Sequence, residues 1–247
     1  MSVSAACRAA GARCFSVALT LGLGWACLAP ASLAADGWLT TAAHQPVAQT
    51  SSYSQEWAVV AVSDDGQRVA VAWETVIGHE VKLRFFNGAG SPISAELLVN
   101  AGFTGHIQDE PMLAMDSEGR TLVCWSDRNA YDGDGMGVFG RVYDGGGVPY
   151  GPPFVISEDT TQSQWEPMPR ALPDGGWVVA FNGEDDGEAW FRRLTAEGVP
   201  VGADVNLATF HNNAQVDAAV TVDAEGRLFT AFVDYGGNVV GGMGTNI

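Results

Sequence analysis

Short runs of alternating or continuous hydrophobic residues follow one another along most of the chain. Examples are "RTLVCW" from Arg120 and "GVFGRVYD" from Gly137, which are rich in valine and aromatic residues and are bounded by glycine and aspartate. Runs of this length between turn residues are typical of β-strands, and no stretch after residue 34 has the 3.6-residue period of a helix. The pattern therefore predicts an all-β protein.

These runs recur as a repeat. The template R-x-[FYL]-x-x-x-G-x-P begins at Arg84, Arg141 and Arg192, which are 57 and 51 residues apart. Upstream of it, an acid stands fifteen residues before an aromatic residue in three copies, and a looser first copy is two residues longer. The acid–aromatic pairs are Glu56 and Trp73, Glu110 and Trp125, Glu166 and Phe181, and Asp217 and Phe232.

Each repeat contains four short strands and about 50 residues, which is the size of a propeller blade. A β-solenoid would have shorter rungs, and stacked sandwiches would have no reason to repeat their turns. We therefore predict a β-propeller-like array of four-stranded antiparallel blades, with about three and a half repeats that form an incomplete ring.

The repeat resembles that of a group of bacterial secreted repeat proteins, whose units contain DGG-V-W followed by DGDG-x-G-V-x-x-R-x-[FY]-D-x-x-G-x-P. The likeness rests on "QDEPMLAMDSEGRTLVCW", on "DGDGMGVFGRVYDGGGVPYG" and on "GVPVG" from Gly198. It covers most of residues 54–247. The resemblance implies an extracellular or cell-surface propeller-like domain, and it implies no activity, because one fold can carry many functions.

The chain divides into a leader and a repeat region. Residues 1–34 combine Arg8 and Arg13 with an apolar run and small residues before a cleavage point, which predicts a secretory signal. We thus expect an exported protein in the periplasm, on the cell surface or outside the cell. We expect residues 35–53 to be a linker or partial closing strand and the last unit to be truncated, as in a fragment of a longer propeller. The predicted units are 54–107, 108–163, 164–214 and 215–247.

The composition is strongly acidic, with 12 Lys and Arg against 29 Asp and Glu and a net charge of −17. Removal of the signal would take two arginines and leave a net charge of −19. Such a surface argues against nucleic acid or anionic lipid as a partner and favours cations or basic surfaces. The apolar run of the signal is too short for a confident membrane span, so no span is expected in the mature chain.

The acidic loop "DRNAYDGDG" is the first candidate site. Asp127, Asp132 and Asp134 could offer carboxylates to Ca²⁺, which takes six to eight oxygen ligands, and the glycines would let the loop curl. The spacing is not that of an EF-hand, and D-G and G-D-G are also ordinary turn chemistry. The first interpretation is therefore a turn that feeds a strand, and the second is a weak calcium loop.

The repeated acids form the second candidate site. In a ring they would surround one mouth of the central channel, where they could bind a cation or a basic ligand, and adjacent tryptophans could stack on a sugar. Their recurrence in every unit favours instead a role in packing one blade on the next. The candidate ligand-binding residues are Glu56, Trp57, Glu110, Trp165, Glu166 and Asp217.

No familiar catalytic motif is present in the sequence. The four histidines lack metal-ligand spacing, and neither a G-x-S-x-G elbow nor a phosphate loop occurs. We therefore predict an exported, non-catalytic binding or adhesion module that recognises a glycan or a surface protein and is stabilised by calcium. The alternative is a polysaccharide-active enzyme, a glycosidase or lyase, on a propeller scaffold.

Overall fold

The computed structural model describes residues 46–49, 54–103, 105, 107–129, 131–183, 188–207, 215–234 and 245–246. These residues form fifteen β-strands and no helix, which confirms the prediction of an all-β protein. Within this part of the chain there is accordingly no apolar helix that could span a membrane. The predicted signal, residues 1–34, lies outside the described residues.

The strands form four antiparallel sheets, which we number blades 1 to 4 in chain order. Within each blade, strands that follow one another in the sequence are hydrogen-bonded neighbours. Blade 1 contains β1 (Gln55–Val62), β2 (Arg68–Thr75), β3 (Glu80–Asn87) and β4 (Leu97–Leu98). Blade 2 contains β5 (Gln108–Met115), β6 (Thr121–Asp127), β7 (Gly137–Tyr143) and β8 (Phe154–Val155). Blade 3 contains β9 (Gln164–Ala171), β10 (Trp177–Gly183), β11 (Glu188–Leu194) and β12 (Pro200–Asn206), and blade 4 contains β13 (Gln215–Val222), β14 (Arg227–Asp234) and β15 (Thr245–Asn246).

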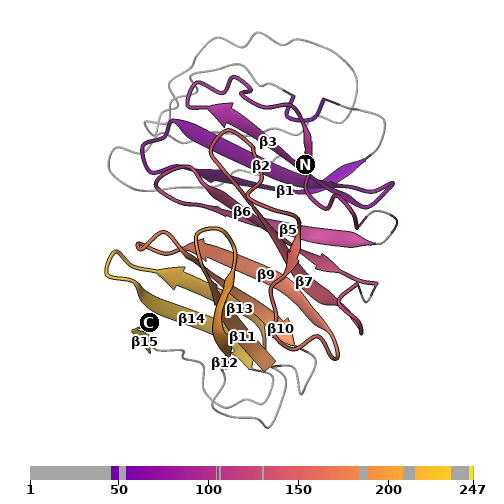
Figure 1. Cartoon of the computed structure of the whole chain (residues 1–247), viewed down its shortest axis with the longest axis vertical. Helices are drawn as coiled ribbons and strands as arrows, with labels where there is room; N and C mark the ends of the chain where they lie inside the picture. Colours follow the sequence, from indigo (N-terminus) through magenta and orange to yellow (C-terminus); the bar gives the residue numbers. More distant parts are fainter. Residues whose placement is uncertain are drawn as a thin grey trace, which may run out of the picture.

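The blades stack face to face in sequence order (Figure 1). The first strand of each blade lies beside that of the next, so β1, β5, β9 and β13 stand in one row, as the innermost strands of a propeller do. The prediction of a propeller-like array is confirmed. The four blades do not close into a ring in the described part of the chain.

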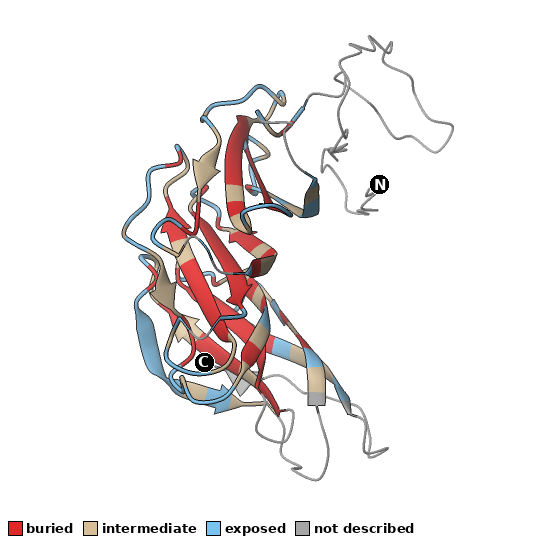
Figure 2. Cartoon of the chain, turned by 90° about the vertical axis from the view of Figure 1, so that its right-hand side faces the viewer, coloured by how far each residue is buried: buried red, intermediate tan, exposed pale blue. Residues whose placement is uncertain are grey.

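The second strands explain why the sequence contains continuous apolar runs. All seven residues of β6 are buried, because alternate side chains point to opposite faces and both faces are covered by a blade. Val123 and Trp125 pack in the core between blades 1 and 2, whereas Leu122 and Cys124 pack in the core between blades 2 and 3. Figure 2 shows the buried residues concentrated within the stacked sheets.

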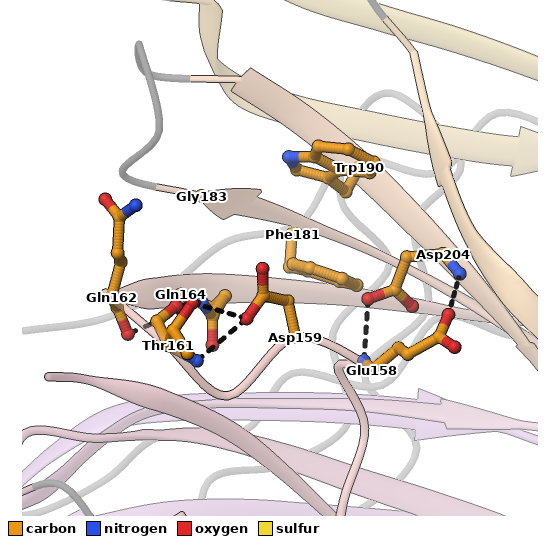
Figure 3. A pocket seen from close by; sticks show the side chains of 9 residues that line it. All are labelled: Glu158, Asp159, Thr161, Gln162, Gln164, Phe181, Gly183, Trp190 and Asp204. Carbon is orange, nitrogen blue, oxygen red and sulfur yellow. Dashed lines mark hydrogen bonds between the residues drawn. The ribbon is translucent and has the colours of Figure 1, made fainter. Parts of the chain in front are cut away.

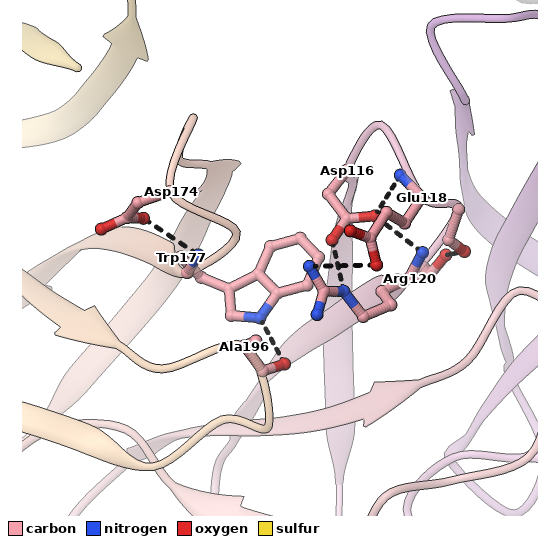
Figure 4. A network of polar contacts seen from close by, with 9 residues as sticks. Asp116, Glu118, Arg120, Asp174, Trp177 and Ala196 are labelled. Carbon is pink, nitrogen blue, oxygen red and sulfur yellow. Dashed lines mark hydrogen bonds and ion pairs between the residues drawn. The ribbon is translucent and has the colours of Figure 1, made fainter.

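The D-x-x-G segment between the first two strands is a turn closed by its aspartate. In blade 2, one carboxylate oxygen of Asp116 accepts hydrogen bonds from the backbone N–H of Glu118 at 2.9 Å and of Arg120 at 2.8 Å. The other oxygen accepts a bond from Nε of Arg120 at 2.6 Å (Figure 4). Gly119 has φ of +83°, which glycine adopts without strain. A Cβ on Gly175 would lie 2.8 Å from the Arg120 guanidinium, so this turn also packs against blade 3.

The repeated arginines of the third strands connect neighbouring parts of the array. Arg141 of blade 2 donates from Nη1 to the carbonyl of Val99, which follows the outer strand of blade 1, at 3.1 Å. Arg84 of blade 1 makes the equivalent bond to the carbonyl of Val47 at 2.7 Å. These arginines therefore tie each blade to the chain that precedes it, and they do not converge on one ligand.

Candidate functional site

The first strand of each blade is interrupted at the same point by a β-bulge. In blade 2, Asp109 pairs with Ser126 and regular pairing resumes only at Met112. Glu110, in the bulge, has a left-handed backbone, which is uncommon for a residue other than glycine and is associated with functional sites. The equivalent residues are Trp57, Glu110, Glu166 and Asp217, with φ of 51°, 53°, 54° and 54°.

In blade 1, the acid that the repeat predicted for the bulge position, Glu56, lies one residue before the bulge residue. Glu56 pairs with Glu74 in the register that Asp109 shares with Ser126, so Glu56 corresponds to Asp109 and not to Glu110. Trp57 takes the bulge position instead. The first repeat is two residues longer than the others, and its acid–aromatic spacing does not show which residue enters the bulge.

The bulges of blades 2 and 3 also attach each of these blades to the one before. The backbone N–H of Glu110 donates to Oε2 of Glu74 at 3.2 Å, and that of Glu166 donates to Oγ of Ser126 at 3.1 Å. The acceptors Glu74 and Ser126 occupy equivalent positions near the ends of β2 and β6. In these two blades the backbone N–H of the bulge residue makes the contact with the preceding blade.

Four carboxylates from β2, β5 and β9 gather at the loop-bearing end of the blades. We call Glu74, Asp109, Glu110 and Glu166 the axial acid cluster. Arg128 lies among them, with Nε hydrogen-bonded to Asp109 and Nη2 3.6 Å from Oε1 of Glu110. The Ser126 hydroxyl donates to the other oxygen of Glu110 at 3.3 Å. Glu74 is only 7% exposed, whereas Glu166 is exposed.

Burial and mutual repulsion favour the protonated forms of these acids. Burial, followed by the charge of Asp109, raises the pKa of Glu74 to about 7. Burial and the charges of Asp109 and Glu166 also raise the pKa of Glu110, although Arg128 and the Ser126 hydroxyl oppose that rise. A carboxyl that holds its proton near neutral pH beside carboxylates next to a cation is the arrangement that general acid–base catalysis requires.

The remaining predicted ligand-binding residues lie on the first strands of their blades. Trp57 is 60% exposed, Asp217 is exposed and Trp165 is half-buried. Trp165 pairs with Asn182 and thus occupies the position of Asp109 in its own blade. The structure places Trp57, Glu110, Glu166 and Asp217 at equivalent points of neighbouring inner strands, where a ligand at the axis would meet several of them.

The three aspartates of the predicted calcium loop have different surroundings. Asp127 is fully buried and accepts hydrogen bonds from the Gln108 side chain and from the backbone N–H of Asn129 at 2.8 Å. Neither carboxylate oxygen of Asp132 has a hydrogen-bond partner, and burial raises its pKa. Asp134 is exposed. Nowhere among the described residues do three His, Cys, Asp or Glu side chains lie together in a group that could hold a metal ion.

Calcium binding by this loop stays a prediction, which thermal melting can test. Two or three carboxylates should bind Ca²⁺ with Kd on the order of 10⁻⁴ to 10⁻³ M, and millimolar Ca²⁺ should then stabilise the fold by about 1 kcal/mol. The double substitution Asp132→Asn and Asp134→Asn should remove that gain. Equal melting temperatures with Ca²⁺ and with chelator, in both proteins, would identify the loop as a turn only.

The same loop packs against the link that leads into blade 3. The backbone N–H of Met136 donates to Oγ of Ser163 at 3.2 Å, and the Gln164 N–H donates to the Met136 carbonyl at 2.7 Å. Gly135 has φ of +61°, and a Cβ there would lie 2.7 Å from the carbonyl oxygen of Gln162. The glycine is required because the two backbones approach so closely.

We expect Gly135→Ala to destabilise the protein by about 1–3 kcal/mol, because the methyl group overlaps the Gln162 carbonyl. Gly66→Ala is the matched control. Gly66 has nearly the same φ, +67°, but a Cβ there would meet no atom within 4 Å. Urea unfolding measures both variants, and equal losses of stability would show that the contact with the link contributes nothing.

Sequence reasoning missed Glu74, Asp109 and Arg128. The sequence contains enough information to place Glu74. It directly follows the repeat aromatic Trp73, so it had to lie at the loop-bearing end of its strand. Asp109 is adjacent to a predicted residue. No repeat marks Arg128, which follows the end of β6 and has no counterpart in the template.

Comparison with known proteins reveals similarity at the level of structure alone. No protein-family model matches the chain, and no curated protein sequence matches it. A thermostable family-43 glycoside hydrolase shares 12% identity over 72% of this chain and 65% of its own, with a TM-score of 0.45. An α-L-arabinanase of Penicillium chrysogenum, solved with arabinobiose, shares 15% identity over 70% of this chain and 57% of its own, with a TM-score of 0.44. The chain thus spans less than two thirds of the length of these two proteins.

A third solved structure is more similar in fold. The α-L-arabinofuranosidase Arb93A of Fusarium graminearum, in complex with an iminosugar inhibitor, has a TM-score of 0.52 and 9% identity over 87% of this chain and 71% of its own. This likeness supports the propeller-like architecture. The prediction of a non-catalytic binding or adhesion module is wrong on this comparison, because the protein of similar fold is an enzyme, an α-L-arabinofuranosidase.

Proposed function

We propose that the protein is a glycoside hydrolase that cleaves a polysaccharide at the axial acid cluster. The observation that carries the proposal is the position of Glu74, whose buried carboxyl lies 3.2 Å from the backbone N–H of Glu110 at the inner strand ends. The propeller-like fold, which the arabinofuranosidase Arb93A shares, adds support. Glycans that contain arabinose are therefore the first substrates to test.

The residues of the cluster fit the two roles that glycoside hydrolysis needs. One carboxylic acid protonates the leaving oxygen, and a carboxylate on the other side either activates water or attacks the sugar. We assign the first role to Glu74, because its raised pKa of about 7 leaves a large fraction of it protonated up to neutral pH. We assign the second role to Glu110, because its carboxyl accepts a hydrogen bond from the Ser126 hydroxyl and lies beside the Arg128 guanidinium, and both contacts oppose the rise of its pKa.

Other residues position these two groups and the substrate. Arg128 contacts both Asp109 and Glu110, so it fixes the second carboxylate and is a positioning residue. The half-buried Trp165 and the exposed Trp57 offer aromatic faces on which sugar rings stack. We further propose that the enzyme meets its polysaccharide outside the cytoplasm, a proposal that rests on the signal pattern of residues 1–34.

The test is the release of reducing ends from a panel of polysaccharides by the full chain, with arabinan, galactan, xylan and polygalacturonate as substrates. We expect at least one neutral polymer to be hydrolysed, and Glu110→Gln to lower that rate by more than about 10²-fold. Glu118→Gln is the matched control, since Glu118 lies in the turn at the opposite end of the blade and its side chain is 72% exposed. Absence of hydrolysis across the panel, or equal rates in all three proteins, would contradict the proposal.

A lyase would leave a different product. Elimination produces an unsaturated sugar with strong ultraviolet absorbance, whereas hydrolysis produces a saturated end. We expect saturated products only, because the proposed roles of Glu74 and Glu110 deliver a proton and water to the glycosidic bond.

A further inference from the structure

A cavity of about 450 Å³ opens at the junction of blades 2 and 3 (Figure 3). Its walls come from the link between β8 and β9, from β10 and β11, and from β12. The residues that matter for its chemistry are Glu158, Asp159, Gln164, Phe181, Trp190 and Asp204. None of the described lining residues belongs to the axial acid cluster, and the cavity has the volume of a small-molecule site.

One wall of the cavity is aromatic. Trp190 is half-buried and borders the cavity, while Phe181 beneath it is 1% exposed and belongs to the core. A Cβ on Gly183 would lie 3.1 Å from Cδ1 and from Nε1 of Trp190, so the backbone holds the edge of the indole. A fixed indole that keeps part of its surface open is suited to stacking on the apolar face of a sugar ring.

The facing wall carries carboxylates, as Figure 3 shows for Glu158 and Asp159. Oε2 of Glu158 accepts bonds from the Asp204 N–H at 3.1 Å and from Nη1 of Arg192 at 3.3 Å. Oδ1 of Asp159 accepts bonds from the N–H of Thr161 at 2.8 Å and from its hydroxyl at 2.7 Å, and these bonds lower the pKa of Asp159. With Asp204, three acids face one arginine, so the wall is negatively charged.

The link that carries these acids has a fixed shape. Gln164 is buried, and its Nε2 donates to the Thr161 carbonyl at 2.9 Å. Gln162 has a left-handed backbone with φ of 65°, and Gly135 of the acidic loop packs against its carbonyl group. A strained link that is held from two sides pre-organises the polar wall, and a pre-organised wall loses less entropy when a ligand binds.

We propose that this cavity is a second carbohydrate-binding site, which holds a neutral sugar ring stacked on Trp190 with its hydroxyls donating to Glu158 and Asp159. Carboxylates accept such bonds strongly. They repel uronic acids and other anionic sugars, so the site selects neutral glycans. This second site is not catalytic. On the proposed function, it would hold a polysaccharide while the axial acid cluster cleaves it.

The test is the binding of neutral and uronic-acid oligosaccharides of equal length, measured by calorimetry on Glu110→Gln protein so that turnover does not interfere. The probes are arabino-, galacto- and xylotetraose against tetragalacturonate. We expect at least one neutral probe to bind and tetragalacturonate not to bind. Trp190→Ala and Asp159→Asn, each added to Glu110→Gln, should weaken binding about tenfold. Asp159 is exposed, so its substitution leaves the fold intact even if Trp190→Ala does not.

Tyr150→Ala, made in the same background, is the matched control, because Tyr150 is an exposed aromatic residue that belongs neither to the cavity nor to the axial acid cluster. Affinity within twofold of the parent in Trp190→Ala and Asp159→Asn, or equal binding of tetragalacturonate, would overturn the second site. This outcome is distinguishable from failure of the proposed function. A protein that binds the neutral probe through Trp190 but hydrolyses no polymer contradicts the proposed function alone, and hydrolysis without a Trp190 effect on binding contradicts this inference alone.

Discussion

Replacement of Glu74 by glutamine is expected to lower kcat/KM for polysaccharide hydrolysis by about 10²–10⁴-fold. The amide has the size of the carboxyl and can still accept the hydrogen bond from the Glu110 N–H, which measures 3.2 Å in the wild type. It cannot supply a proton to the leaving oxygen. In the wild type, kcat/KM should fall as the pH rises through about 7, the pKa of Glu74.

The same substitution should act on stability in the opposite direction. The pKa of Glu74 in the folded protein, about 7, is higher than its ordinary value of 4.5, so its contribution to stability is fully present below pH 4.5 and is lost as the pH rises through 7. Glutamine resembles the protonated form of Glu74 and does not ionise, so the variant does not lose stability as the pH rises. At pH 8, Glu74→Gln should therefore be more stable than the wild type by roughly 2–3 kcal/mol, and the difference should be small at pH 5.

Urea unfolding at the two pH values, together with rates for wild type, Glu74→Gln and Glu118→Gln, checks both effects. A slower enzyme that is also more stable at pH 8 cannot owe its loss of rate to misfolding. An unchanged kcat/KM in Glu74→Gln, or lower stability than the wild type at pH 8, would contradict the assignment of Glu74 as a buried proton donor.

The second large effect is expected from Trp125→Ala, which should destabilise the fold by about 3–5 kcal/mol. Trp125 is 0% exposed, packs in the core between blades 1 and 2, and stacks at 6.1 Å from the ring of Phe139. Its indole N–H also donates to the side chain of Gln108, which is fully buried. The substitution therefore leaves a cavity and removes a donor from a buried polar group.

Trp57→Ala provides the matched control, because the same side chain is 60% exposed there. Its effect should stay within about 0.5 kcal/mol. Urea unfolding measures both variants at one pH. Similar losses in the two proteins, or a loss below about 1 kcal/mol for Trp125→Ala, would mean that the packing between blades contributes far less than its burial implies.

The architecture could be predicted from the sequence because its physical requirements repeat. The continuous run of β6 reflects burial on both faces, and Asp116 with Gly119 marks a turn that each blade needs. Arg141 recurs for a similar reason, since every blade must be tied to the chain before it. Each of these features depends on residues close together in the sequence, so a template of fixed spacing reveals them.

The site could be predicted only in part, because its chemistry depends on contacts that do not repeat. Glu74 meets Glu110 across 36 residues of sequence, and a serine takes the place of Glu74 in the next blade. The bulge in β1 depends on backbone conformation, so the sequence could not show that Trp57 rather than Glu56 occupies it. Trp190 has a core-like pattern, and only the packing of Gly183 against it shows that one part of the ring borders a cavity.

The most direct test of the central claim, that the axial acid cluster breaks glycosidic bonds with Glu74 as proton donor, compares two substrates of the Glu74→Gln protein. One is the polymer hydrolysed by the wild type, and the other is the 2,4-dinitrophenyl glycoside of the sugar that it releases. Dinitrophenolate leaves without a proton, so we predict that Glu74→Gln retains at least about a tenth of the wild-type kcat on the aryl glycoside while its rate on the polymer falls by about 10²-fold or more. Equal losses on the two substrates, or no loss on the polymer, would contradict the claim.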